Sequence, residues 1–273
     1  SQSLKSKFRQ LQLNPQSNDT QTKLSWCFLR TAKIIFPSCL DTANQILLFL
    51  WKMIHPQYAI IFDCDGTLTD SLVHGLTSAQ YAVRRMDAHH ITTEDIHQYF
   101  GIAADKILFQ LMDQDPVKAQ EAFEHFLDNQ RLLARDTKLF AGIHELLSAL
   151  KDRQIPIALV TGRHSRDLNI MLDEHQLQAH FSIMVSDDQV SAPKPNPEGI
   201  LKAAAHLGIP PQNTLYIGDS PVDVEAAHRA GATSVAVVWD PHANQNALAE
   251  KQPHFTINDP FEILRIFDQF ITK

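Results

Sequence analysis

Asp63 directly follows the short apolar run Ala59–Phe62, and Asp65 stands two residues later, just before Gly66. In open parallel sheets, ligands bind outside the carboxyl ends of the strands, which is where this order places both carboxylates. Two carboxylates this close repel each other unless a proton or a cation lies between them, and a hard cation such as Mg²⁺ prefers oxygen ligands. The motif therefore predicts a metal-assisted site, although an aspartate-rich turn without chemistry would have the same sequence.

Two further polar positions stand where a ligand could be held. Thr161 and Gly162 follow the apolar run Ile157–Val160, so that a hydroxyl group and a flexible turn end a predicted strand. Lys194 has a proline on each side, and these prolines stiffen the backbone that carries its ammonium group. Each has an ordinary alternative when taken alone, because Thr161 can be structural and Lys194 can be a solvated surface lysine.

A second acidic motif follows the apolar run Thr214–Ile217. It contains Gly218, Asp219, Ser220 and Asp223, so that two acids stand four residues apart after another predicted strand. A helix cap would explain the two acids on their own. The order of all these motifs, each at a strand end or in a turn, instead favours one shared site.

This combination resembles the haloacid dehalogenase superfamily, and within it the phosphatase branch of phosphoglycolate phosphatases and β-phosphoglucomutase-like enzymes. The similarity covers about residues 58–260 and includes all four motifs of that family. It implies a phosphoric monoester hydrolase in which Asp63 attacks phosphorus, while Asp65 acts first as general acid and then as general base. It also implies that Thr161 and Lys194 hold the phosphoryl oxygens.

The same resemblance implies a Mg²⁺ cofactor bound by Asp63, Asp219 and the backbone carbonyl of Asp65. Asp223 would then orient the lysine or a metal-bound water. Independently of the family, a phosphoryl group carries negative charge on its oxygens, so its transfer needs positioning and cationic groups. The expected supporting residues are Asp223, Gly218 and Ser220.

Weaker candidates for substrate contact are Gly162 and Arg163, which follow Thr161, and Lys106 in a helical segment. The start of a helix explains Arg163 equally well. The expected substrate is a small phosphorylated metabolite, but no residue pattern points to glycolate, a sugar or a nucleotide.

Charge, cysteine content and the start of the chain bear on the partners and the location of the protein. The 273-residue chain has a formal net charge of −7 and no basic run beyond Arg84-Arg85, so nucleic acid is not an expected partner. Its three cysteines form an odd number without CxxC spacing, which is typical of a reducing compartment. The polar start of the chain shows no signal-peptide pattern, so a cytoplasmic protein is expected. A monomer and a homodimer both remain open.

The remaining residues supply the elements that must position these groups. From Tyr58 onward, short apolar runs alternate with helical patterns, which predicts an α/β fold with a Rossmann-like three-layer parallel sheet core. The predicted strands are Ala59–Phe62, Ile157–Val160, Ile183–Val185, Thr214–Ile217, Ser234–Val238 and Phe255–Ile257. The helices between them include Ala141–Arg153, Arg166–Gln176, Pro197–Leu207 and Val222–Ala230.

One segment interrupts this alternation, and it predicts a helical cap domain, residues 74–137, inserted after the first strand. The catalytic core then comprises residues 58–73 and 138–273. The helices expected in and next to the cap are Leu72–Met86, Thr93–Phe100, Ala104–Leu111 and Pro116–Ala134.

The first 57 residues, 1–57, are predicted to be an N-terminal helical extension. Leu24–Ile54 is rich in large apolar residues, but polar residues interrupt it too often for a membrane-spanning helix. We expect it to pack on the core or on a second subunit, because an exposed apolar surface of this size would drive aggregation. Contact of residues 24–54 with a membrane surface is the less favoured alternative.

Three other functions fit parts of the pattern. Mutases of the β-phosphoglucomutase kind usually carry Glu-Asp in the fourth motif, where this chain has Gly218-Asp219, and His74 stands one place earlier than their histidine. A metal-independent haloacid dehalogenase normally lacks the second acid of the first motif, so Asp65 argues against it. A catalytically idle scaffold or interaction protein, recruited through residues 1–57, is disfavoured by the intact motifs.

Overall fold

The computed structural model describes residues 57–98 and 102–272. From Tyr58 onward these residues belong to one compact unit of the chain. The predicted N-terminal extension lies outside the described residues apart from Gln57, so its packing stays a prediction. No helix within the described ranges has the length and hydropathy that crossing a lipid bilayer would require.

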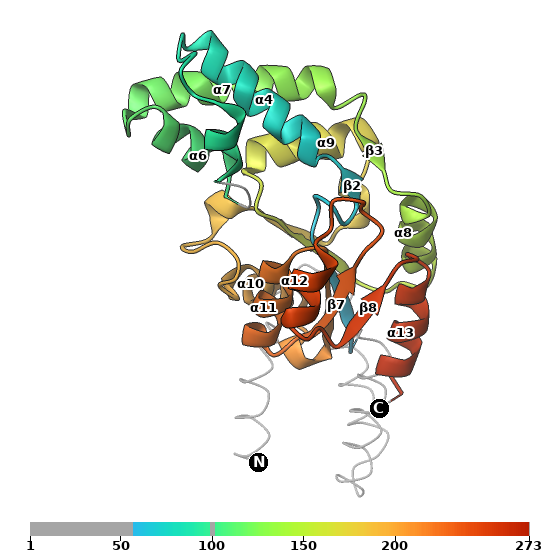
Figure 1. The fold of residues 1–273 in the computed structure, drawn as a ribbon. Coiled ribbons are helices and arrows are strands. Elements are labelled where there is room, and N and C mark those ends of the chain that lie inside the picture. Colours follow the sequence, from blue (N-terminus) through green and yellow to red (C-terminus); the bar gives the residue numbers. More distant parts are fainter. Residues whose placement is uncertain (1–56, 99–101, 273) are drawn as a thin grey trace, which may run out of the picture. The chain divides into compact units, whose positions relative to one another are not determined.

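A six-stranded parallel sheet lies at the centre of this unit (Figure 1). Its strand order is β5-β4-β1-β6-β7-β8. The predicted strands agree with it, except that β6 extends by one residue to Gly218, and β7 both begins and ends one residue earlier than predicted, at Thr233 and Val237. The strands are β1 (Ala59–Phe62), β4 (Ile157–Val160), β5 (Ile183–Val185), β6 (Thr214–Gly218), β7 (Thr233–Val237) and β8 (Phe255–Ile257).

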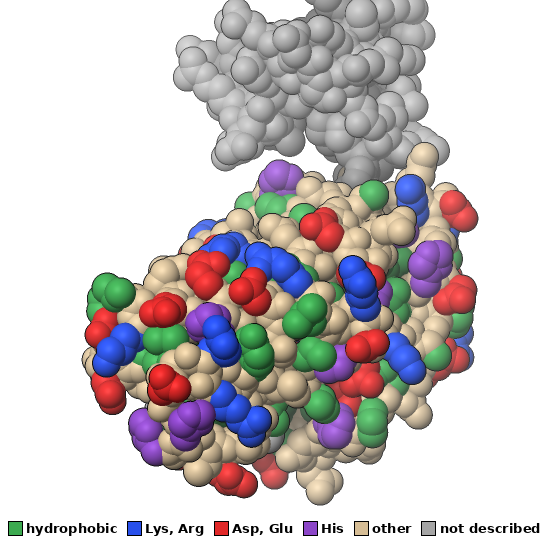
Figure 2. All heavy atoms as spheres, turned by 90° about the horizontal axis from the view of Figure 1, so that it is seen from above, with side chains coloured by type: hydrophobic (Ala, Val, Ile, Leu, Met, Phe, Trp, Pro, Cys, Tyr) green, Lys and Arg blue, Asp and Glu red, His purple; other side chains and the backbone are tan. Residues whose placement is uncertain are grey.

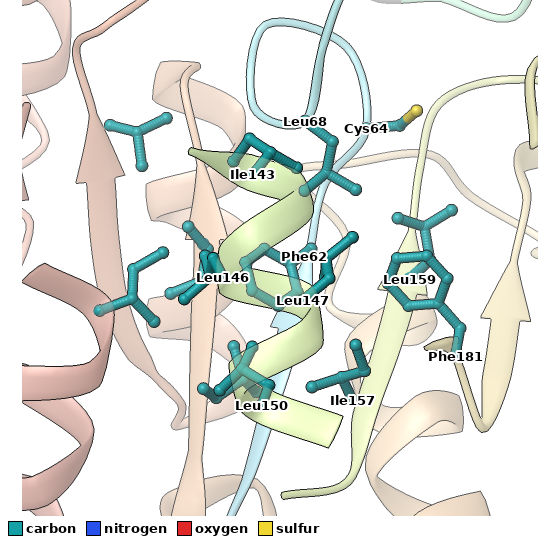
Figure 3. Close-up of a cluster of buried hydrophobic side chains, with 14 of the residues drawn as sticks. Phe62, Cys64, Leu68, Ile143, Leu146, Leu147, Leu150, Ile157, Leu159 and Phe181 are labelled. Carbon is teal, nitrogen blue, oxygen red and sulfur yellow. The ribbon is translucent and has the colours of Figure 1, made fainter. Parts of the chain in front are cut away.

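Helices cover both faces of the sheet, because successive residues of each strand point to opposite faces and both faces are apolar. Ile60 and Phe62 belong to one hydrophobic cluster, whereas Ile61 between them belongs to another. Figure 3 shows residues of the first cluster, with α8 lying against β1. The first cluster includes residues of α8 (Ile143–Asp152), α9 (Ser165–His175) and α13 (Glu262–Phe270), and the second includes residues of α10 (Glu198–Leu207) and α11 (Pro221–Ala230). The predicted three-layer α/β core is thus confirmed.

Between β1 and β4 the chain leaves the sheet and forms a helical cap with its own hydrophobic core, around Ala82, Leu108 and Phe126. The cap helices are α4 (Leu72–Arg85), α5 (Thr93–His97), α6 (Ala104–Leu111) and α7 (Pro116–Leu133). A cap inserted after the first strand is therefore confirmed, whereas its boundaries at residues 74 and 137 stay a prediction. The helix predicted over Thr93–Phe100 is shorter in the structure, since α5 ends at His97.

Two very short strands have no signal in the sequence. β2 (Thr69–Asp70) and β3 (Lys138–Leu139) form an antiparallel ribbon where the chain enters and leaves the cap. Two residues are too few to show the alternation that identifies a strand. The other described elements are α12 (Gln245–Glu250) and the 3₁₀ turns Gln178–His180, Asp187–Gln189 and Pro211–Asn213.

Candidate active site

Three carboxylates meet at the carboxyl edge of the sheet. Asp63 follows β1, and Asp219 and Asp223 follow β6; one oxygen of each lies within 4.8 Å of the others. The reason is topological, because β1 and β6 are parallel neighbours with Phe62 opposite Ile217. Asp63 is only 7% exposed and Asp223 only 1% exposed.

Glycines allow the backbone to approach these acids closely. Gly66 has a φ of +70°, and a Cβ placed on it would overlap the carboxylate of Asp219. A Cβ on Gly218 would lie 2.5 Å from the Cβ of Asp223. The hydroxyl of Thr67 donates a hydrogen bond of 3.0 Å to Asp219. Larger residues at either glycine position would displace an acid from the cluster.

Lys194 joins two of the three acids. Its Nζ lies 2.9 Å from Asp63 Oδ2 and 2.7 Å from Asp223 Oδ1. The other Asp223 oxygen accepts hydrogen bonds from the backbone N–H and hydroxyl of Ser220, at 3.1 and 2.8 Å, which cap the start of α11. The lysine is therefore held at a fixed place beside Asp63.

The cluster carries more negative than positive charge. Burial raises the pKa of Asp63 to about 7, with attraction from Lys194 opposing this shift and repulsion from Asp223 adding to it. Burial and repulsion from Asp223 and Asp63 also raise the pKa of Asp219 well above its usual value. For Lys194, burial lowers the pKa, but the two acids outweigh burial and raise it well above the ordinary value.

A divalent cation fits this donor set. Asp63 Oδ1 is buried and has no hydrogen-bond partner among the described residues. Asp63 is one of the three acids that each place one carboxylate oxygen within 4.8 Å of the others. Hard cations such as Mg²⁺ take carboxylate oxygens as ligands. A cation at this place would partner the orphaned oxygen and reduce the repulsion between the acids.

The side chain of Asp65 does not belong to the acid cluster of Asp63, Asp219 and Asp223. The Asp65 carboxylate pairs with Arg163 instead, with Nε of the arginine 2.9 Å from Oδ2 and its NH2 nitrogen 2.6 Å from Oδ1. Asp223 takes the third place in the acid cluster. Burial favours a higher pKa for Asp65, but the charge and hydrogen bonds of Arg163 outweigh it and lower the pKa.

Arg163 does not face an open substrate space in this arrangement. It is 8% exposed, and its NH1 nitrogen lies 2.9 Å from Asp167 Oδ2. Burial raises the pKa of Asp167 to about 6 despite the opposing effect of Arg163. Arg163 thus lies in an ion-pair network inside the protein, and its contact with substrate stays a prediction.

Thr161, Gly162 and Lys194 line the same small pocket, which also includes Asp187. The Thr161 hydroxyl accepts a hydrogen bond of 3.2 Å from the backbone N–H of Arg163. Lys106, from cap helix α6, forms an ion pair with Asp187. The three predicted core positions thus border one pocket, and the predicted cap position, Lys106, is connected to it through its ion pair with Asp187.

A second ion pair joins the cap to the core. Arg166 of α9 donates through both terminal nitrogens to Glu124 of α7, each at 2.7 Å. Next to it, the rings of Phe123 and His164 have centroids 4.9 Å apart. The cap therefore contacts the loop that follows β4, which is the loop of Thr161 and Arg163.

Comparison with known proteins identifies the family. Residues 60–237, more than half of the chain, match the model of the haloacid dehalogenase-like hydrolases. The chain belongs to this family. A provisionally named pyrophosphatase, PpaX, of Caldanaerobacter subterraneus is 31% identical over 76% of this chain and 93% of its own length. A phosphoglycolate phosphatase of Aquifex aeolicus is 27% identical over 78% of this chain and 98% of its own length.

Solved structures of the family agree. A hydrolase from Pseudomonas syringae has a TM-score of 0.65 at 27% identity, covering 78% of this chain and 99% of its own. A provisionally named β-phosphoglucomutase from Thermotoga maritima has a TM-score of 0.60 at 28% identity, covering 78% and 99%. The chain is a haloacid dehalogenase-type phosphatase, in agreement with the resemblance of its motifs.

Three polar side chains of this hydrolase's site were not predicted from the sequence. The hydroxyl of Tyr216 lies 3.1 Å from Asp223 Oδ1 and 3.2 Å from the carbonyl oxygen of Val160. Ser71 donates a hydrogen bond to Asp65, and Asp167 pairs with Arg163. The available signals were a lone tyrosine in an aliphatic strand and an Arg-Asp pair four residues apart.

Proposed function

We propose that this hydrolase cleaves phosphomonoesters of small metabolites with Mg²⁺, through a phospho-aspartate formed on Asp63. One observation carries the proposal: Asp63 is a buried carboxylate with Lys194 on one oxygen and, among the described residues, no hydrogen-bond partner on the other, beside two further acids. A carboxylate has two oxygens, so one can bind a cation while the other attacks phosphorus. A carboxylate nucleophile divides a difficult hydrolysis into two easier displacements.

In the first displacement an oxygen of Asp63 attacks phosphorus, and the bond between phosphorus and the ester oxygen breaks. Burial favours a higher pKa for Asp65, but Arg163 lowers this pKa, so Asp65 must take up a proton before this step. Asp65 then gives this proton to the departing oxygen, and the leaving group departs as an alcohol. Lys194 and Thr161, which line one pocket, are positioned to hold phosphoryl oxygens. The first displacement leaves a phosphoryl group on Asp63 and an ionised Asp65.

In the second displacement a water oxygen attacks the same phosphorus, and the Asp65 carboxylate takes a proton from that water. The bond between phosphorus and Asp63 breaks, inorganic phosphate leaves, and both aspartates return to their starting forms. Mg²⁺, when bound by Asp63, Asp219 and the Asp65 carbonyl, supplies positive charge that stabilises the phosphoryl oxygens. Asp223, Ser220 and Gly218 support the lysine and the acid cluster.

The substrate class follows from the relatives and from the surface. Relatives carry the names phosphoglycolate phosphatase and pyrophosphatase, and both names denote small phosphorylated compounds. Figure 2 shows acidic and basic side chains interspersed over one face of the described unit, without the broad basic patch typical of nucleic-acid binding. We infer a small metabolite as substrate, a cytoplasmic location, and a monomer or homodimer.

Phosphate release from p-nitrophenyl phosphate and from a panel of phosphorylated metabolites tests the function. Activity should require Mg²⁺, disappear in EDTA and return when Mg²⁺ is added. Incubation with substrate followed by acid quenching and mass spectrometry should find the phosphoryl group on the peptide that contains Asp63. Full turnover in metal-free buffer would refute the proposal.

A further inference from the structure

A second charged cluster lies beside the acids of the metal site, and it surrounds the carboxylate of Asp65. Nε of Arg163 lies 3.0 Å from Oδ1 and 2.9 Å from Oδ2 of Asp65, and its NH2 nitrogen lies 2.6 Å from Oδ1. Ser71 donates a further hydrogen bond to Oδ1. Both oxygens of the Asp65 carboxylate are therefore held, and its orientation is fixed.

Arg163 is itself held on several sides. Its NH1 nitrogen lies 2.9 Å from Asp167 Oδ2, its backbone N–H donates to Thr161, and its carbonyl oxygen accepts from the N–H of Asp187 at 2.9 Å. Asp167 lies in the first turn of α9, where the helix dipole favours negative charge. The guanidinium group therefore has one well-defined position between the two carboxylates.

We propose that Arg163 is a positioning residue that fixes the direction of the Asp65 carboxylate, and that Asp167 holds Arg163 in place. The inference rests on the proposed acid–base role of Asp65. Proton transfer requires the carboxyl group within about 2.6–3.2 Å of the reacting oxygen, so a freely rotating aspartate would be a poorer acid. All three guanidinium nitrogens already hold carboxylates, so in this arrangement Arg163 acts through Asp65 and not on the substrate.

Two matched substrates distinguish positioning from a general structural role. Phenyl phosphate and p-nitrophenyl phosphate present the same ester, but phenolate is the more basic leaving group and needs the proton of Asp65 more. The value of kcat/KM covers all steps up to departure of the leaving group. A variant that only reduces the amount of folded enzyme lowers kcat/KM for both substrates by the same factor.

Arg163→Ala should lower kcat/KM for phenyl phosphate about tenfold more than for p-nitrophenyl phosphate. Asp65→Asn should show a larger selective loss, of about 10²–10⁴-fold, because it removes the acid itself. In the Asp65→Asn background, Arg163→Ala should add no further selective loss, since the two residues act as one unit. Arg163→Lys should restore part of the loss, because an ammonium group can hold one oxygen but lacks the planar fork of arginine.

Two further variants complete the test. Asp167→Asn should show the same selective loss to a smaller degree. It keeps the shape of the side chain, so it tests the role even if Arg163→Ala fails to fold. Arg265→Ala, at an exposed position on α13, is the matched control and should leave the ratio unchanged. An equal loss for both substrates in Arg163→Ala, Arg163→Lys and Asp167→Asn would overturn the positioning role. A wild-type enzyme without Mg²⁺-dependent activity on either ester would overturn the proposed function, and this inference with it.

Discussion

The sheet edge and the cap use charged side chains in different ways. At the sheet edge, Asp63, Asp223 and Lys194 come from three distant segments and form one buried cluster. One contact between the cap and the core pairs Arg166 with Glu124, whose side chains are 43% and 46% exposed. Ion pairs thus occur both in a buried site and at a solvent-exposed contact.

Burial decides what each kind of pair can do. An exposed pair contributes about 0–1 kcal/mol, because water and salt screen it and two long side chains lose freedom. Removing one member of a buried pair leaves an uncompensated charge and costs about 3–5 kcal/mol. We therefore expect the charged groups at the sheet edge to keep fixed positions, while the ion pair between Arg166 and Glu124 can form and break with little change in free energy.

The largest effect is expected from Asp63→Asn. Asparagine keeps the shape of the side chain but is a poor nucleophile, so turnover should fall by at least about 10³-fold. Phosphate release measures activity, and a thermal melt checks that the fold is retained. Activity close to wild type would refute the phospho-aspartate mechanism and the inference that the chemistry takes place at the sheet edge.

Removing the metal should make stability depend on pH in a defined direction. Asp63 has a folded-state pKa of about 7, raised from 3.8, so between these values the folded protein holds a proton that the unfolded chain releases. The stabilising contribution of protonated Asp63 should therefore be fully present in the metal-free protein below about pH 4, and it should be lost as the pH rises through 7. Asp219, whose pKa is also raised, acts in the same direction.

Melting temperatures in EDTA at pH 5 and pH 8 measure this dependence. A change of 1 kcal/mol in unfolding free energy should shift the melting temperature by about 2–4 °C. Mg²⁺ should raise the melting temperature more at pH 8, where the acids are ionised and able to bind it. Asp63→Asn is the control and should reduce the pH dependence in EDTA. A metal-free protein that becomes more stable from pH 5 to pH 8 would show that the acids do not repel one another as described.

Local sequence predicts much of the sheet edge, and the reason is physical. A buried parallel strand appears as a continuous apolar run, and the residues that follow it must stand at the carboxyl edge, as Asp63 and Asp219 do. The sequence does not show that β1 and β6 are neighbours, although the order of the motifs at the strand ends favours one shared site. The structure brings Asp63, Lys194, Asp219 and Asp223 together.

The remaining contacts depend on tertiary placement. Whether Asp65 turns toward Asp63 or toward Arg163 depends on side-chain rotation and on where α9 begins, and neither leaves a periodic signal. The ion pair between Lys106 and Asp187 depends on how the cap lies against the core. The role of Tyr216 at the site was not predicted, because a tyrosine in a buried strand has the same sequence pattern as a residue that only packs in the core.

Tyr216→Phe should have an intermediate effect. The tyrosine is 1% exposed, and its hydroxyl lies within hydrogen-bond distance of Asp223 and of the Val160 carbonyl. Phenylalanine keeps the packing and removes the hydroxyl, so we expect a loss of about 1 kcal/mol in unfolding free energy. Urea denaturation measures it. Unchanged stability would mean that Lys194 and Ser220 suffice to hold Asp223.

The smallest effect is expected at the exposed cap contact, from Glu124→Gln. This change removes the charge that pairs with Arg166 but keeps a polar side chain of similar length, so unfolding free energy should fall by less than about 1 kcal/mol and kcat/KM by less than about fivefold. A double-mutant cycle with Arg166→Gln measures the coupling, which should shrink further at high salt because exposed charges are screened. Gln120, which donates to Glu124 at 2.6 Å, offers a control, since Gln120→Ala leaves the charge pair intact. A loss in Glu124→Gln as large as that in Asp63→Asn would break the comparison, because it would mean that the chemistry depends on the cap contact as strongly as on the buried acids.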